Sequence, residues 1–208
     1  MNILIADDHA IVRKGLVELI HEAYPDAVIA EVENSHGVLE QVNKQSWNII
    51  LMDISMPGRN GVETLKQIRA NGVQTPILML SAHPEDQYAL RVLKAGASGF
   101  LNKESAVDEL LIAISKVMAG KKYISATVAD ILAEAHTDTG NKPAHELLSD
   151  REMQVLQLIG SGRTVSEIGE QLSLSVNTIS TYRARLLEKL SLKNNAELIR
   201  YAVDHGLV

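Results

Sequence analysis

The first 120 residues alternate short apolar runs with segments in which apolar residues recur every three or four positions. Residues such as Val12, Leu16 and Leu19 lie on one helical face, and the amphipathic stretch 110–117 closes the series. The apolar runs between such segments predict five strands, at residues 2–6, 27–31, 48–52, 76–80 and 99–101. These runs are continuously apolar rather than alternating, which predicts strands buried on both faces.

This alternation of strand and helix predicts an α/β doubly wound fold. Each parallel crossover needs a helix and is right-handed, so the helices are expected to cover both faces of a five-stranded parallel sheet. We therefore expect residues 1–120 to form one domain.

The pattern changes after residue 120. Residues 123–135 allow one further helix, and the polar stretch 136–143, which contains Gly and Pro, predicts a linker. Ser149 and Glu152 then have the spacing of a capping box. From residue 147 onward only helices are predicted, the last three at 165–172, 176–190 and 194–204. The expected division is therefore a domain at 1–120, a linker with a possible helix at 121–146, and a small all-α domain at 147–208.

Composition narrows the function classes. The 208 residues contain no cysteine, which excludes disulfides, thiolate zinc sites and cysteine nucleophiles. There is no apolar run of 18 residues and no signal-peptide pattern, so we expect a cytoplasmic protein without a membrane helix.

The net charge of −6 argues against a protein that coats nucleic acid without specificity. Residues 1–146 hold 13 basic and 19 acidic residues, which gives −6, while residues 147–208 hold seven of each and are neutral. If the second part binds DNA, it must do so through a local basic patch.

Five polar residues follow or end the predicted strands: Asp7, Asp8, Asp53, Ser81 and Lys103. Ligand sites of open parallel sheets lie at the carboxyl ends of the strands, so we expect these side chains in one crevice. Three neighbouring carboxylates favour Mg²⁺, and a carboxylate can act as a nucleophile toward phosphorus. The cation, the ammonium and the hydroxyl would neutralise phosphoryl oxygens. Taken singly, each residue also fits a helix cap or a solvated loop.

Four motifs in this region together resemble a response-regulator receiver domain: ADDH at 6–9, MDISMPG at 52–58, LSA at 80–82 and FLNK at 100–103. The resemblance implies that Asp53 is the phospho-acceptor. It further implies that Asp7, Asp8, Asp53 and the backbone carbonyl of Ser55 hold Mg²⁺, and that Ser81 and Lys103 bind the phosphoryl oxygens.

By the same resemblance, Phe100 is a switch aromatic that rotates inward, although it lacks a tyrosine hydroxyl; a plain core aromatic is the alternative. Ser55 and His83 are expected near the solvent path of the phosphate, where they would tune its lifetime.

Residues 162–190 have the layout of a helix-turn-helix. The longer helix buries Ile179, Tyr182, Leu186 and Leu190. Residues 176–193 carry a charge of +3, from four basic residues and Glu188. An exposed basic face of this kind suits the major groove of DNA, although an ordinary amphipathic helix with a solvated face has the same spacing.

Together with LSDRE at 148–152 and LSLSVNTI at 172–179, this segment resembles the LuxR/NarL (FixJ) type of DNA-binding domain over residues 147–208. The resemblance and the exposed face together give these expected DNA contacts: Thr164, Val165, Asn177, Thr178, Ser180, Thr181, Arg183, Ala184, Arg185 and Lys189. Ser180 and Tyr182 depart from the family's more frequent lysine and histidine, so the base preference should differ.

The two resemblances imply a DNA-binding transcriptional response regulator of a two-component system, not an enzyme, switched by Mg²⁺-dependent phosphorylation of Asp53. Its expected partners are double-stranded DNA, a sensor histidine kinase or phosphotransfer protein, and a second copy of the chain when phosphorylated. One alternative is an aspartate-based phosphohydrolase. The other is a phosphorylation-independent DNA-binding regulator whose receiver serves as a dimerisation module.

Overall fold

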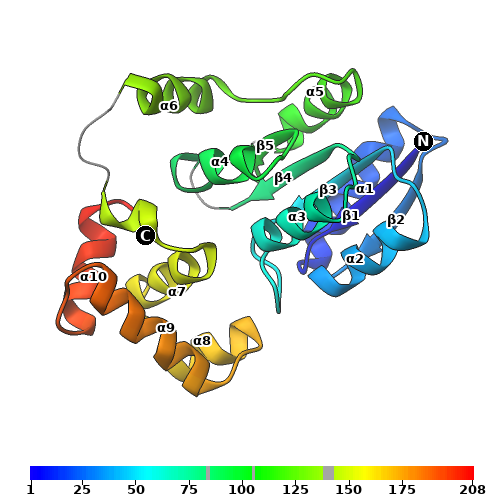
Figure 1. Ribbon diagram of the computed structural model, residues 1–208. Coiled ribbons are helices and arrows are strands. Elements are labelled where there is room, and N and C mark those ends of the chain that lie inside the picture. The colour runs from blue at the N-terminus through cyan, green and yellow to red at the C-terminus, as the bar shows by residue number, and fades with distance from the viewer. Residues whose placement is uncertain (83–84, 105, 138–142) are drawn as a thin grey trace. The chain divides into compact units, whose positions relative to one another are not determined.

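The computed structural model describes residues 1–82, 85–104, 106–137 and 143–208. The chain divides into two compact units, Met1–Thr137 and Asp138–Val208 (Figure 1). The first unit alternates strands and helices, in the order β1 (Asn2–Ala6), α1 (Ala10–Ala23), β2 (Val28–Val32), α2 (Ser35–Lys44), β3 (Ile49–Asp53), α3 (Gly61–Ala70), β4 (Ile77–Ser81), α4 (Glu85–Lys94), β5 (Gly99–Asn102), α5 (Ala106–Met118) and α6 (Ala126–Thr137).

The strands form one parallel sheet in the order β2-β1-β3-β4-β5, which confirms the predicted doubly wound fold. The chain moves outward from β1 to β2 and then returns to place β3 on the other side of β1. The crevice at such a reversal, between the carboxyl ends of the two central strands, is where open α/β sheets bind ligands.

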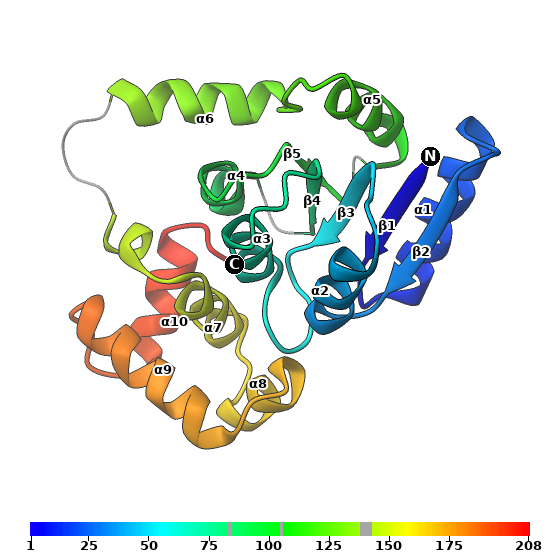
Figure 2. The same ribbon diagram turned by 45° about the vertical axis from the view of Figure 1, so that its right-hand side comes forward.

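The core of this unit lies on both faces of the sheet. Side chains alternate between the faces of a strand, and Ile5, Leu51 and Leu80 point to the same side as buried residues of α1 and α5. Helices α2, α3 and α4 cover the opposite face (Figure 2). Strands β3 and β4 are buried at all five positions, as their apolar sequences predict.

The prediction that every strand is buried on both faces is wrong for β2. It is an edge strand with a neighbour on one side only, and the Val28 side chain is 61% exposed. Apolar sequence alone did not separate this edge strand from the central ones.

The segment after α5 runs along the outer edge of β5. Its Tyr123 forms an isolated parallel bridge with Gly99, in which the Tyr123 amide donates to the Ser98 carbonyl at 3.0 Å and the Phe100 amide donates to the Tyr123 carbonyl at 3.4 Å. A Cβ on Gly99 would lie 2.7 Å from that tyrosine carbonyl oxygen, so the approach requires glycine. The helix predicted at 123–135 therefore begins later, as α6, which packs on α4.

Residues 138–142, the central part of the predicted linker, lie outside the described residues. The second unit then contains only helices, which in chain order are η1 (Ala144–Leu147), α7 (Asp150–Gly160), α8 (Val165–Leu172), α9 (Val176–Lys189) and α10 (Asn195–Asp204), as far as the structure describes it. Helix α7 packs against α9 and α10, and α8 packs against α9. This is the small all-α domain that the sequence predicts.

Side-chain caps set the starts of these helices. The predicted capping box is present: the Ser149 hydroxyl accepts from the Glu152 amide at 3.3 Å, and the Glu152 carboxylate accepts from the Ser149 amide at 2.8 Å. Thr164 and Glu167 form a second box at the start of α8. Ser173 ends that helix with a left-handed φ of 54°, which turns the chain into α9. In the part of the chain that the structure describes, no helix is both long and apolar enough to span a membrane.

Candidate functional site

The polar residues predicted at the strand ends gather at the carboxyl edge of the sheet. Asp7 directly follows β1, Asp53 is the last residue of β3, and Ser81 is the last residue of β4. Lys103 follows β5, and its amide donates to the Ser81 carbonyl at 2.7 Å, which ties the two strand ends together. The parallel pairing of the strands thus brings Asp7 and Lys103, which are 96 positions apart, into one site. In the same register Asp53 pairs with Leu80, the residue before Ser81.

Lys103 bridges two buried carboxylates. Its ammonium nitrogen lies 2.7 Å from Oδ2 of Asp7 and 2.9 Å from Oδ2 of Asp53. The two aspartate side chains are 0% and 1% exposed and the lysine is 13% exposed. One cation therefore compensates two anions inside the protein.

The opposing effects of burial and charge pairing shift the pKa values of Asp53 and Lys103. Burial raises the pKa of Asp53 above its ordinary value; Lys103 opposes this shift, and Asp7 adds to it. Burial would lower the pKa of Lys103, but attraction to Asp53 and Asp7 outweighs it and raises the pKa above the usual lysine value.

These carboxylates retain coordination capacity that protein atoms do not use. Among the described residues, neither oxygen of Asp53 receives a hydrogen bond of normal geometry. Lys103 lies 2.9 Å from Oδ2, and the Ser55 backbone acts to lower the pKa of Asp53. Buried carboxylate oxygens without hydrogen bonds are costly unless a cation or ligand meets them. The donor set is oxygen-rich and matches the preference of Mg²⁺.

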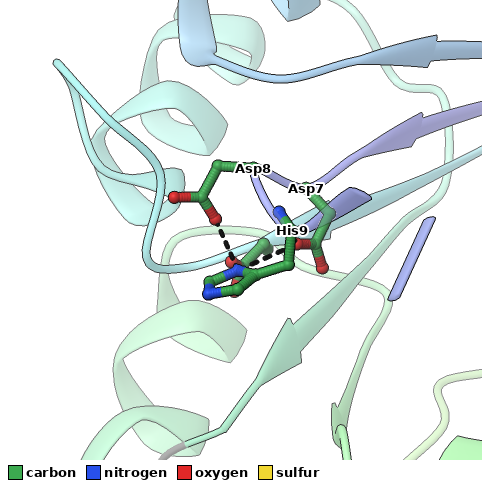
Figure 3. A group of neighbouring side chains, drawn as sticks. Asp7, Asp8 and His9 are labelled. Atoms are coloured by element: carbon green, nitrogen blue, oxygen red, sulfur yellow. Dashed lines mark hydrogen bonds and ion pairs between the residues drawn. The ribbon is translucent and has the colours of Figure 1, made fainter. Parts of the chain in front are cut away.

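Asp8 and His9 complete the cluster at the solvent side (Figure 3). The Asp8 side chain is 28% exposed, and its Oδ1 lies 2.7 Å from Nδ1 of His9. The same ring nitrogen lies 3.3 Å from Oδ1 of Asp7. One ligand atom from each of Asp7, Asp8, His9 and Asp53 fits within a 4.8 Å span.

The other predicted site residues that the structure describes lie on the neighbouring strands or on the loop after β3. Ser81 is 1% exposed at the end of β4, and Phe100 is fully buried in the middle of β5, paired with Met79. Ser55 is half-buried two residues after Asp53. His83 lies outside the described residues.

Two supporting residues were missed by the sequence analysis. Arg13 on α1 is buried, donates to the Asp7 carbonyl at 2.6 Å and pairs with Glu33 at 2.7 Å. Its spacing to the buried Leu16 would have indicated a position on the inner helix face. Gly61 starts α3 so close to β3 that a Cβ would lie 2.2 Å from the carbonyl oxygen of Asp53, which fixes the loop after the candidate acceptor.

In the second unit, α8 and α9 form a helix-turn-helix whose outer face carries the predicted DNA contacts. Exposed positions are Thr164, Asn177, Ser180, Thr181, Ala184, Arg185 and Lys189, while Val165, Thr178 and Arg183 are half-buried. Ile179 and Leu186 face inward and are fully buried.

Two of the three basic residues among the predicted contacts have partners within the protein. The ammonium of Lys189 lies 2.7 Å from Oε2 of Glu152, and the Arg183 guanidinium donates to Oδ1 of Asn195 at 2.5 Å. Burial acts to raise the pKa of Glu152, but hydrogen bonds from Lys189 and Ser149 outweigh it and lower that pKa below the usual value.

Comparison with known proteins supports both halves. Residues 3–115 match the family model of the response regulator receiver domain, and residues 146–202 match that of the bacterial regulatory proteins of the luxR family. Response regulator UvrY of Escherichia coli (strain K12) is 33% identical over 100% of this chain and 95% of its own length. Response regulator GacA of Pseudomonas viridiflava is 32% identical over 100% and 98%, respectively.

Among solved structures, RcsB from Salmonella enterica serovar Typhimurium, bound to promoter rprA in the presence of phosphomimetic BeF3−, superposes with a TM-score of 0.65. It is 27% identical and the match covers 97% of each chain. A structure of two RcsB dimers bound to two parallel DNAs has a TM-score of 0.61 at 27% identity, with 98% of each chain covered. With a receiver fold whose acidic site is intact, a helix-turn-helix unit, and relatives aligned over its full length, this chain belongs to the DNA-binding two-component response regulators of the LuxR family.

Proposed function

We propose that Asp53 accepts a phosphoryl group and that this modification controls DNA binding by the second unit. The observation that carries the proposal is the buried Asp53 carboxylate, which Lys103 approaches at 2.9 Å and which has no normal hydrogen bond within the described chain. Such a carboxylate is held in place yet keeps oxygen lone pairs free for phosphorus.

The reaction needs few groups. An oxygen of Asp53 forms a bond to phosphorus while the bond from phosphorus to the donor, a phosphohistidine nitrogen, breaks and its electron pair stays on nitrogen. Lys103 neutralises phosphoryl oxygen charge and the Ser81 hydroxyl donates to a phosphoryl oxygen. When bound by Asp7, Asp8, Asp53 and the Ser55 carbonyl, Mg²⁺ supplies further neutralisation.

We place the approach of the phosphoryl donor on the side of α1, next to Lys103. A groove of about 430 Å³ opens beside Lys103 and is lined by Val12, Leu16 and Leu19 of α1. Ile11, on the same helix, is 87% exposed. We assign this apolar surface to the sensor histidine kinase or phosphotransfer protein.

For the second unit we propose the ten DNA contacts expected from the sequence. We rank their contribution to DNA binding by whether each side chain already has a partner within the protein. Arg185 is exposed on α9 and available to a base edge or a phosphate. Lys189 should contribute least, because Glu152 holds its ammonium. Exposed Ile199 and Val203 on α10 give the unit an apolar strip for a second copy of the chain.

Domain roles follow from this assignment: residues 1–120 act as receiver, 121–146 as linker and 147–208 as DNA-binding domain. The protein then works as a regulator in the cytoplasm, where its DNA is, and not as an enzyme that turns over an external phosphate ester.

The first test identifies the residue that accepts the phosphoryl group. Wild type and Asp53→Asn are incubated with Mg²⁺ and acetyl phosphate, and intact mass with peptide mapping locates any phosphoryl group. We expect one group on Asp53 of the wild type and none on the variant. Equal labelling of both proteins would refute the assignment.

The second test measures DNA contact, on a duplex selected by the protein from a random pool. Arg185→Ala should weaken binding by about 1–3 kcal/mol, whereas Lys44→Ala on α2 of the first unit serves as the matched control and should not. Unchanged affinity of Arg185→Ala would remove α9 from the interface.

A further inference from the structure

His9 is turned toward the acidic site rather than toward its own helix. It is the N-cap residue of α1, yet its side chain makes no capping hydrogen bond. Instead the ring nitrogen Nδ1 lies 2.7 Å from Oδ1 of Asp8 and 3.3 Å from Oδ1 of Asp7 (Figure 3). Its backbone amide also donates to Oδ1 of Asp7 at 2.8 Å.

These separations fit the coordination shell of an octahedral ion. Ligands at about 2.1 Å from such an ion are about 3 Å apart when adjacent and about 4.2 Å apart when opposite. The ring nitrogen is 2.7 and 3.3 Å from its two carboxylate oxygens, which is close to the spacing of adjacent ligands. All four candidate ligand atoms lie within 4.8 Å of one another, which is slightly wider than the spacing of opposite ligands. The imidazole is 64% exposed, so it can adjust without disturbing the core.

An independent observation shows that this cluster is aimed at a ligand. Asp53 is 1% exposed, and its Oδ1 has neither a normal hydrogen bond nor an ion pair among the described residues. The contacts inside the cluster therefore leave one nearly fully buried carboxylate oxygen of Asp53 without a hydrogen bond of normal geometry.

We infer that His9 is a nitrogen ligand of the metal site and gives it a preference for late first-row divalent ions, such as Ni²⁺, that an all-oxygen site lacks. Mg²⁺ favours oxygen ligands and retained waters, whereas imidazole suits nickel, copper and zinc, which also bind more tightly along the first-row series. The inference rests on the proposed function, because it concerns the same metal site. It adds that such ions compete with Mg²⁺ for the acceptor pocket, with affinity set by residue 9.

The test uses the untagged full chain and calorimetric titration with NiCl2 and with MgCl2. His9→Asn removes the imidazole but keeps a good N-cap side chain, so α1 should still start correctly. His21→Asn, an exposed histidine in the last turn of the same helix, is the matched control for loss of a surface histidine. Asp53→Asn marks the binding that belongs to this site.

We expect the ratio of Ni²⁺ to Mg²⁺ affinity at the Asp53-dependent site to fall about tenfold or more in His9→Asn and to stay unchanged in His21→Asn. An unchanged ratio in His9→Asn, with Mg²⁺ still bound, would overturn this inference and leave the proposed function standing. A wild type that binds no Mg²⁺ in an Asp53-dependent manner would overturn both.

Discussion

Lys103 should be required for the stability of the first unit as well as for phosphoryl transfer. Replacing it by Met keeps the volume of the stem but removes the only cation within ion-pair distance of the buried Asp53 carboxylate among the described residues. Asp7 loses the same partner, at 2.7 Å. The variant therefore leaves two carboxylates, 0% and 1% exposed, without their shared cation, although Asp7 keeps its contact with His9.

The size of the effect follows from two bounds. Removing one partner of a buried ion pair costs about 3–5 kcal/mol. The protein can limit this loss by protonating one aspartate, and moving a proton onto a carboxyl of pKa about 3.9 at pH 7 costs about 4 kcal/mol. We therefore expect Lys103→Met to lower the free energy of unfolding by about 3–4 kcal/mol, a large share of what a domain of this size has.

The assay is urea unfolding in EDTA, followed by the fluorescence of Trp47. This is the single tryptophan of the chain, it is 6% exposed, and it lies in the first unit, so it reports on that unit alone. Lys44→Met is the control: its ion pair with Glu40 is exposed, and we expect no measurable change in stability.

A second substitution tests whether the unpaired aspartates cause the loss of stability. Asp53→Asn added to Lys103→Met removes one of the two stranded charges and should recover about 2 kcal/mol, roughly half of the loss expected for a broken buried pair. A Lys103→Met protein within about 1 kcal/mol of wild type, or a double variant no more stable than the single one, would show that the pair does not set the stability of this unit.

Three further predictions concern packing and charge elsewhere. Gly99→Ala should lower stability by about 1–3 kcal/mol in the Trp47 assay, because its Cβ would meet the Tyr123 carbonyl at 2.7 Å. Gly15→Ala, in α1 with no atom within 4 Å of the added carbon, should instead raise stability by about 0.5–1 kcal/mol; equal effects of the two would contradict the packing argument. Lys189→Met should cost the second unit about 1 kcal/mol at pH 7, with the half-exposed lysine screened by water, as measured by thermal unfolding. Since the partner carboxylate has a lowered pKa, the stabilisation is present above its ordinary value of 4.5 and disappears as pH falls through the folded-state pKa; a difference that persists in acid would refute the assignment.

The sequence predicted the sheet and the central site because both depend on local patterns plus one rule of topology. Apolar runs indicated the strands, and the carboxyl ends of parallel strands meet at one edge, so this rule alone places Asp7, Asp53 and Lys103 together. The start of α7 at Ser149 was predicted for the same reason, since a capping box is specified within four residues.

The remaining features depend on contacts between distant parts of the chain. Tyr123 lies along β5 only because Gly99 leaves room, and that pairing moved the start of α6. The pairing of Lys189 with Glu152 spans 37 positions and changes the expected role of that lysine in DNA binding. No local pattern specifies such partners.

The orientation of the His9 side chain is another feature that the sequence did not predict. Its position after Asp7 and Asp8 was visible in the sequence, but whether the ring caps α1 or turns to the carboxylates depends on side-chain geometry. The edge exposure of β2 likewise follows from strand order, which an apolar run does not encode.

The central claim is that phosphorylation of Asp53 controls DNA binding, and one comparison tests it most directly. DNA affinity and oligomeric state are measured for the full chain and for Asp53→Ala, with and without acetyl phosphate and Mg²⁺, by fluorescence anisotropy on a selected duplex and by sedimentation. We predict that the donor tightens dimerisation and DNA binding in the wild type only. If both proteins bind alike whether or not the donor is present, the receiver is not a phosphorylation switch, and a phosphorylation-independent regulator takes its place.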